Sequence, residues 1–146
     1  MPDRPHITVA TVIQQDDRFL LVREKSDGTY VYNQPAGHVE HGESIIAAAR
    51  RETLEESGWD VEIQELLGIY EYVSPANGIN YIRHCFTAKP VEQVHSGPID
   101  SDIEDVHWLS LDEISNLQDQ LRSPMVWRAV QDYLRGQRYP LAVIAK

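Results

Sequence analysis

The chain contains the stretch Gly37-His-Val-Glu-His-Gly-Glu43-Ser-Ile-Ile-Ala-Ala-Ala-Arg-Arg51-Glu52-Thr-Leu-Glu55-Glu56-Ser-Gly58. Glu52, Glu55 and Glu56 are spaced by three and four residues, which places all three on one face of a helix. Like charges at this spacing repel, and they stand near the helix C-terminus, where the macrodipole disfavours anions. Each effect costs about 0.3–1 kcal/mol. A hard divalent cation bound by oxygen ligands would reverse every one of these penalties.

Two simpler explanations of the acidic cluster stay open. Acidic clusters near helix ends are commonly solvated surface, and Arg50 and Arg51 could soften the repulsion as ordinary neighbours. The stretch also holds glycine and arginine at fixed spacings around the acids, however, and this wider pattern favours a functional site.

The wider pattern resembles the Nudix box, whose signature is Gly-x5-Glu-x7-Arg-Glu-U-x-Glu-Glu-x-Gly-U, with U a bulky aliphatic residue. Every glycine, glutamate and arginine of the signature has a counterpart here: Gly37, Glu43, Arg51, Glu52, Glu55, Glu56 and Gly58. Thr53 and Trp59 occupy the two U positions. Both are packing positions, so the departure concerns local packing and leaves the chemistry intact.

The resemblance extends over most of the chain. Asn33-Gln-Pro-Ala-Gly-His38 leads into the box, and Asp100-Ser-Asp-Ile103 follows it. Leu121-Arg-Ser-Pro124 and Gly136-Gln-Arg-Tyr-Pro-Leu141 lie near the C-terminus. Together these segments resemble the bacterial NudJ-type phosphatases within the Nudix superfamily.

The resemblance implies a metal-dependent hydrolase with Mg²⁺ as cofactor and Mn²⁺ as an alternative. The implied metal contacts are the Gly37 carbonyl and the carboxylates of Glu52, Glu55 and Glu56, which are also the implied catalytic residues. Mg²⁺ suits phosphoanhydride hydrolysis because it binds through a few carboxylates plus substrate phosphates, and a spare carboxylate can accept a proton. Glu52 and Glu56 are both open as general base. An ion pair between Glu43 and Arg51 is implied as support for the site.

Further substrate contacts are implied less specifically. The candidates are His38, Arg122, Arg138 and Tyr139, against the alternatives of a plain loop histidine and of arginines paired with surface acids. An extra acid from outside the box is another expectation, with Asp100, Asp102 and Glu104 as candidates and a solvated loop as the alternative. Tyr30, Tyr32 and Trp127 could stack on a ring, although core packing is favoured for each.

Length and composition restrict the class of protein. The chain has 146 residues, which predicts a single domain over 1–146. Its formal net charge of −10 argues against a nucleic-acid partner. No apolar run reaches the ~18 residues of a membrane helix, and Met1–His6 carries no apolar signal region, so we expect a cytoplasmic protein without a membrane partner. Cys85 is the sole cysteine and is expected in the core. The oligomeric state is not predicted.

Periodicity and turn residues predict alternating strands and helices. Strands are expected over 7–13, 19–22, 30–33, 60–72, 79–88 and 106–109, and helices over 44–57, from Ser110 or Asp112 to Leu117, and from Pro124 to just before Gly136. The last helix has an apolar stripe of Val126, Val130, Tyr133 and Leu134. This order predicts an α/β protein, and the resemblance implies the Nudix α/β/α sandwich with a curved mixed sheet between helices.

The expected function is Mg²⁺-dependent hydrolysis of small phosphorylated metabolites. The resemblance implies nucleoside di- and triphosphates and thiamine-type diphosphates as substrates, with release of orthophosphate. One alternative is a pyrophosphohydrolase of nucleoside diphosphates linked to another moiety, such as ADP-ribose. The others are a non-catalytic nucleotide-binding module and a purely structural acidic domain.

Overall fold

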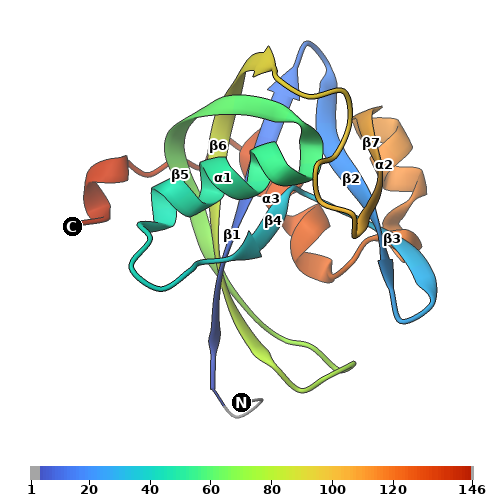
Figure 1. Cartoon of the computed structure of the whole chain (residues 1–146), viewed down its shortest axis with the longest axis horizontal. Helices are drawn as coiled ribbons and strands as arrows, with labels where there is room; N and C mark the ends of the chain where they lie inside the picture. The colour runs from blue at the N-terminus through green and yellow to red at the C-terminus, as the bar shows by residue number, and fades with distance from the viewer. Residues whose placement is uncertain (1–3, 146) are drawn as a thin grey trace.

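Strand β1 (His6–Gln15) is the central strand of a bent, mixed sheet in the computed structural model, which describes residues 4–145 (Figure 1). Its residues from Thr8 to Ile13 are all buried, as the nearly continuous apolar run predicts for a strand covered on both faces. Val9 packs on one side of the sheet, and Ala10 and Val12 pack on the other, because successive side chains of a strand alternate.

The sheet combines one parallel pair with antiparallel pairs. The other strands are β2 (Arg18–Ser26), β3 (Thr29–Asn33), β4 (Ala36–His38), β5 (Trp59–Val73), β6 (Asn80–Gln93) and β7 (Ile103–Ser110). Their order is β3-β2-β1-β6-β5, with β4 on β1 and β7 on β2. Strands β1 and β6 run parallel, and the remaining pairs are antiparallel, which confirms the predicted mixed sheet.

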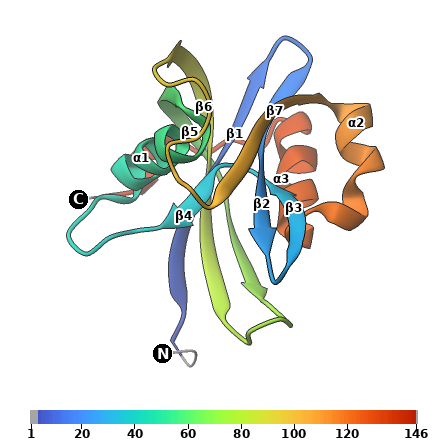
Figure 2. The same cartoon turned by 45° about the vertical axis from the view of Figure 1, so that its right-hand side comes forward.

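The sheet divides along β1, and this division creates the space for a site. Strand β2 pairs with β1 only at Gln14 and Gln15, whereas Thr8–Ala10 pair with β4. The chain that links β3 to β4 crosses between the two halves, where the Thr11 N–H donates to the Pro35 carbonyl over 3.1 Å. In Figure 2, β4 crosses in front of β1, and the chain that leads into it runs across from β3.

Helices cover both faces of the sheet, which confirms the predicted α/β architecture. Helix α1 (Ile45–Ser57) lies on one face, and α2 (Leu111–Asn116) and α3 (Pro124–Leu134) lie on the other (Figures 1 and 2). Two short 3-10 helices complete the chain, η1 (Gln118–Gln120) and η2 (Leu141–Val143). No helix among the described residues has both the length and the apolar character needed to cross a membrane.

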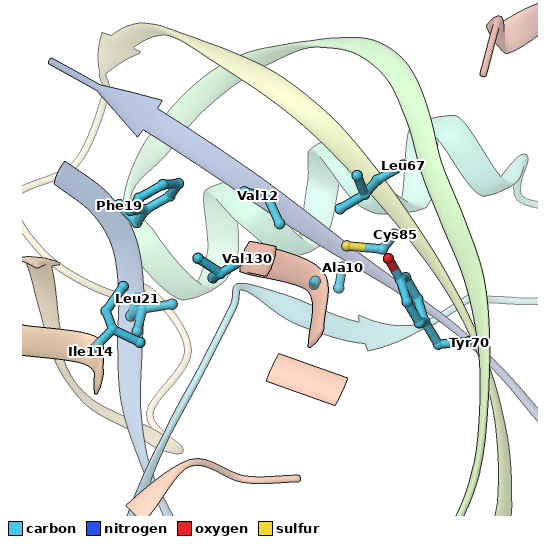
Figure 3. Close-up of a cluster of buried hydrophobic side chains, with 10 residues drawn as sticks. Ala10, Val12, Phe19, Leu21, Leu67, Tyr70, Cys85, Ile114 and Val130 are labelled. Carbon is cyan, nitrogen blue, oxygen red and sulfur yellow. The ribbon is translucent and has the colours of Figure 1, made fainter. Parts of the chain in front are cut away.

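A buried cluster of apolar side chains joins the sheet to α2 and α3. It includes Val12, Phe19, Cys85, Ile114 and Val130 (Figure 3). Cys85 is fully buried, and burial raises the pKa of its thiol to about 11, so the thiol stays neutral in the core as predicted.

Helix α1 begins and ends where its sequence predicts. The Ser44 side chain accepts a hydrogen bond from the Ala47 N–H at 3.1 Å, and Gly58 ends the helix with φ of 80°. In α3, Val126 and Val130 are buried as expected, whereas Leu134 is half-exposed because it lies in the last turn, beyond the sheet. Strand β4 was not predicted, since three residues are too few to show an alternating pattern.

The two positions that depart from the box signature are both packed. Thr53 is buried, and its hydroxyl lies 2.8 Å from that of Thr11 and donates to the Ala49 carbonyl. Trp59 packs edge-on against Trp108, with ring centroids 5.6 Å apart. The departures are therefore accommodated by local packing.

Candidate active site

Helix α1 presents its three acids unequally. The side chain of Glu52 is 14% exposed and Glu56 is 6% exposed, whereas the side chain of Glu55 is 41% exposed. Glu52 and Glu56 are four residues apart and line the same cavity, and Glu55 is not among the lining residues. The predicted shared face exists, but only two of its three carboxylates reach the enclosed space.

Arg51 neutralises part of this acidic cluster. Its Nε and Nη2 donate to the two carboxylate oxygens of Glu43 over 2.7 and 2.9 Å, which is the ion pair implied by the resemblance. Its Nη1 donates to Glu52 at 2.8 Å and to Glu55 at 3.2 Å. These contacts lower the pKa of Glu43 and show that Arg51 softens the repulsion, an alternative left open by the sequence. Arg50 has a different role, because it pairs with Asp60 at 2.7 Å.

Glu56 forms no ion pair with any residue in the part of the chain that the structure describes. One of its carboxylate oxygens accepts a hydrogen bond from the Ala36 N–H at 2.9 Å. Burial raises the pKa of Glu56 to about 9, because desolvation outweighs that hydrogen bond and the charges of Glu24, Glu52 and Asp100 add to it. Burial also raises the pKa of Glu52, against the opposing effect of Arg51. The cavity therefore holds two acids whose ionised forms are disfavoured.

Gly37 lies directly against the Glu52 carboxylate. A Cβ added at Gly37 would fall inside van der Waals contact with the carboxylate carbon and both of its oxygens. A side chain at this position would therefore displace the carboxylate of Glu52. Because Gly37 has no side chain, its carbonyl oxygen and the Glu52 carboxylate could share a cation.

The cavity itself has a volume of about 650 Å³ and spans the division in the sheet. Helix α1 contributes Glu52 and Glu56, β4 contributes Gly37, and the sheet contributes Thr8 and Arg83. Its volume falls within the roughly 300–1,000 Å³ range of small-molecule sites.

These donors have the chemistry of a site for a hard cation. Carboxylate and carbonyl oxygens are the ligands that Mg²⁺ prefers, and a divalent charge would favour the ionised forms of Glu52 and Glu56. Among residues 4–145, no three His, Cys, Asp or Glu side chains are grouped to hold a metal as they stand. Glu55 is turned toward Arg51, so a rearrangement of side chains would be needed for all three box acids to share an ion.

Of the three candidate acids outside the box, the structure brings Asp100 to the cavity. The N–H groups of Ile99 and Asp100 both donate to the Glu55 carbonyl over 2.8 Å, which fixes this loop on the end of α1. Asp102 and Glu104 are exposed and do not line the cavity. The alternative of a solvated loop thus describes Asp102, whereas Glu104 is an exposed residue of strand β7.

The four predicted substrate contacts divide into two pairs. His38 and Arg122 line the cavity. Burial lowers the pKa of His38, and Arg122 donates to Glu24 over 2.8 Å. The structure places Arg138 and Tyr139 outside the cavity lining.

The C-terminal segment that carries the second pair is attached to strand β5. The backbone of Tyr139 exchanges two hydrogen bonds with that of Leu66, over 2.9 and 2.8 Å. The Arg138 guanidinium lies over the Tyr133 ring, 4.2 Å from its centroid. These contacts hold both residues away from the carboxylates.

Sequence reasoning missed several lining residues, among them Tyr72, Tyr81 and Arg83. Tyr81 and Arg83 are in phase with the core residue Cys85 on β6, since they precede it by four and two residues. A charged side chain in phase with a buried one was the available signal for Arg83. Tyr30, Tyr32 and Trp127 do not line the cavity, and Tyr32 and Trp127 pack on the core instead.

Comparisons with known proteins agree with this geometry. The NUDIX domain profile matches residues 4–128. The chain is 37% identical to Phosphatase NudJ of Escherichia coli K12 over 141 residues, which cover 97% of this chain and 91% of that protein.

Two solved structures show the same fold. A NUDIX hydrolase from Nitrosomonas europaea superposes with a TM-score of 0.94 at 43% identity, covering 98% of this chain and 97% of that one. A MutT NUDIX hydrolase from Burkholderia pseudomallei superposes with a TM-score of 0.75 at 24% identity, covering 89% and 98%, which supports the fold alone.

The raised pKa of Glu56 predicts how stability depends on pH in protein treated with a chelator. The ordinary pKa of Glu56 is 4.5 and its pKa in the folded protein is about 9. At a pH between these two values, Glu56 keeps a proton in the folded state and loses it on unfolding. Stability should therefore fall as pH rises through this window, by at most about 1.4 kcal/mol per pH unit from this group. Urea unfolding at several pH values should show a shallower decline for Glu56→Gln. Parallel pH profiles for the two proteins would contradict the assignment.

The contact at Gly37 predicts the effect of Gly37→Ala. The variant should fold, because the clash is with the mobile end of Glu52, but Mn²⁺ affinity should fall by about 10-fold or more. Glu52→Gln is the matched partner in a double-mutant cycle, since both changes act through one carboxylate and their losses should not add. Unchanged Mn²⁺ affinity in Gly37→Ala, measured by calorimetry, would count against this placement.

Proposed function

The chain belongs to the NUDIX family and is a hydrolase, and we propose that it uses Mg²⁺ to hydrolyse phosphoanhydride bonds of small phosphorylated metabolites. The proposed substrates are nucleoside di- and triphosphates and thiamine-type diphosphates, with orthophosphate as product. The observation that carries the proposal is the pair of buried carboxylates, Glu52 and Glu56, on a cavity of small-molecule size. A cytoplasmic location and a single domain over 1–146 remain predictions from the sequence.

Four groups would hold the metal in this proposal: the Gly37 carbonyl and the carboxylates of Glu52, Glu55 and Glu56. When bound, Mg²⁺ neutralises charge on phosphoryl oxygens and favours ionisation of the attacking water. The pairing of Arg51 with Glu43 ties the loop before α1 to the helix and so holds Glu52 in place.

The protein's own carboxylates supply the proton transfer. Glu52 and Glu56 both border the cavity. Either carboxylate, once it has itself ionised, can take the proton of the attacking water. Glu56 is the more deeply buried of the two and lacks a cation partner among the described residues. Both remain proposed as general base. His38 and Arg122 stand at the cavity as proposed substrate contacts.

The phosphatase reading is supported by the similarity to Phosphatase NudJ, whose name denotes phosphate release. The alternative activity is cleavage of a nucleoside diphosphate linked to another moiety. One solved structure similar to this chain is an ADP-ribose pyrophosphatase from Streptococcus suis. That neighbour is 21% identical, so it supports the fold and not the substrate. The complete set of box acids argues against a non-catalytic binding module.

The carboxylates can be tested individually. Glu55→Gln and Glu56→Gln should each lower turnover by about 100-fold or more, because glutamine cannot ionise to bind a cation or accept a proton. The protein should still fold, because glutamine keeps the size and shape of the glutamate side chain. Glu92→Gln, an exposed acid at the end of β6, is the matched control and should retain full turnover. Wild-type turnover in both box variants would refute the proposed roles.

Product analysis separates the two reactions. With Mg²⁺ present, the phosphatase reading predicts orthophosphate from GDP and from thiamine diphosphate. The alternative predicts AMP from ADP-ribose without orthophosphate from GDP. Chromatographic assay of all three compounds would show which bond is cleaved, and no cleavage of any of them would contradict both interpretations.

A further inference from the structure

Arg83 is a cation on the cavity wall that forms no ion pair with a described carboxylate, although Glu24 and Glu56 lie near enough to favour its charged form. It lies on β6 and lines the cavity. Arg122, the other arginine there, is 2.8 Å from Glu24. The ion pairs of residues 4–145 include none for Arg83. In a chain with a net charge of −10, an unpaired arginine at a cavity is notable because carboxylates are plentiful elsewhere.

The guanidinium is held in one orientation by neutral acceptors. Its Nη2 donates to the Gln34 side-chain oxygen at 2.7 Å and to that of Asn33 at 3.1 Å. Gln34 is fixed in turn, since its Nε2 donates to the Val126 carbonyl over 2.9 Å. Asn33 donates to Glu24 over 3.1 Å. These contacts orient the charge without neutralising it.

One donor of this guanidinium is left unsatisfied. The Nε of Arg83 is buried and has no hydrogen-bond partner among the described residues. Burial also lowers the pKa of Arg83, which reflects the cost of holding its charge away from water. Buried charges normally have partners, so an arginine left in this state on a cavity wall is suited to a ligand that brings an anion.

We propose that Arg83 binds a phosphoryl group of the substrate, on the sheet side of the cavity whose helix side carries Glu52 and Glu56. This inference rests on the proposed function and adds to it the residue that recognises the part of the substrate away from the carboxylates. A phosphoryl oxygen fits better than a base carbonyl, because the guanidinium forms no described ion pair and a phosphoryl group brings a counter-charge. The Asn33 and Gln34 side chains keep the fork oriented before the substrate arrives.

The test is ligand affinity in the full-length protein with Mg²⁺. The probes are α,β-methylene ADP, which carries the phosphates but resists hydrolysis at the bridging carbon, and adenosine, which lacks phosphate. Arg83→Gln should weaken α,β-methylene ADP binding by about 10-fold or more and leave adenosine binding unchanged. Arg122→Gln should lose less affinity, because Glu24 already occupies Arg122. Arg18→Gln, remote from the cavity, controls for net charge and should match the wild type.

Several outcomes would overturn the assignment. These are wild-type affinity for the analogue in Arg83→Gln, an equal loss with adenosine, and no binding of the analogue by the wild type. Arg83→Lys, which keeps the charge but not the fork, should bind the analogue about 3-fold or more weakly. If Arg83→Gln does not fold, Arg83→Lys replaces it in the test. Wild-type affinity of Arg83→Lys for the analogue would then overturn the proposal. If the wild type binds the analogue through Arg83 but cleaves no phosphoanhydride, the proposed reaction fails and the Arg83 assignment stands.

Discussion

The burial of two carboxylates four residues apart on α1 is the constraint on which the rest of the site depends. Glu52 and Glu56 are held against a cavity where water cannot fully solvate them, and the pKa of each is raised by that burial. The fold imposes this position. Ser44 and Gly58 set the ends of α1, and the division of the sheet along β1 opens the space that the helix faces. An arrangement so costly in the absence of a ligand is typical of a functional site.

Electrostatic compensation is divided within the cluster. Arg51 neutralises Glu43 and contacts Glu52 and Glu55, so an ordinary neighbouring arginine explains part of the tolerance for like charges. Glu56 is beyond the reach of Arg51, and within residues 4–145 its one hydrogen bond comes from the backbone N–H of Ala36. On the sheet side of the cavity, Arg83 forms no ion pair with a described carboxylate, although Glu24 and Glu56 favour its charged form. The cavity thus combines two carboxyl groups on the helix side, which a metal ion would ionise, with an arginine on the sheet side that forms no described ion pair and can meet a phosphoryl group.

Local signals predicted the parts of this structure that depend on local physics. The capping residues of α1 and the buried run of β1 are determined by neighbours in the sequence, and both were predictable. Strand β4 depends on backbone pairing with β1, so its three residues carry no pattern. The positions of Arg138 and Tyr139 depend on pairing with Leu66, far away in sequence. Arg83 was predictable only as an anomaly, a charge in phase with the buried Cys85, and its partners come from a distant loop.

The most direct test of a cation between these carboxylates is calorimetric titration of the chelator-treated protein with Mg²⁺ near neutral pH. The measurement is repeated in buffers of different ionisation enthalpy. Because Glu56 retains its proton up to about pH 9 in the metal-free protein, we expect a saturable site and the release of about one proton per ion bound. Glu56→Gln should release correspondingly less. A titration without saturation, or a binding heat that is the same in every buffer, would contradict the account.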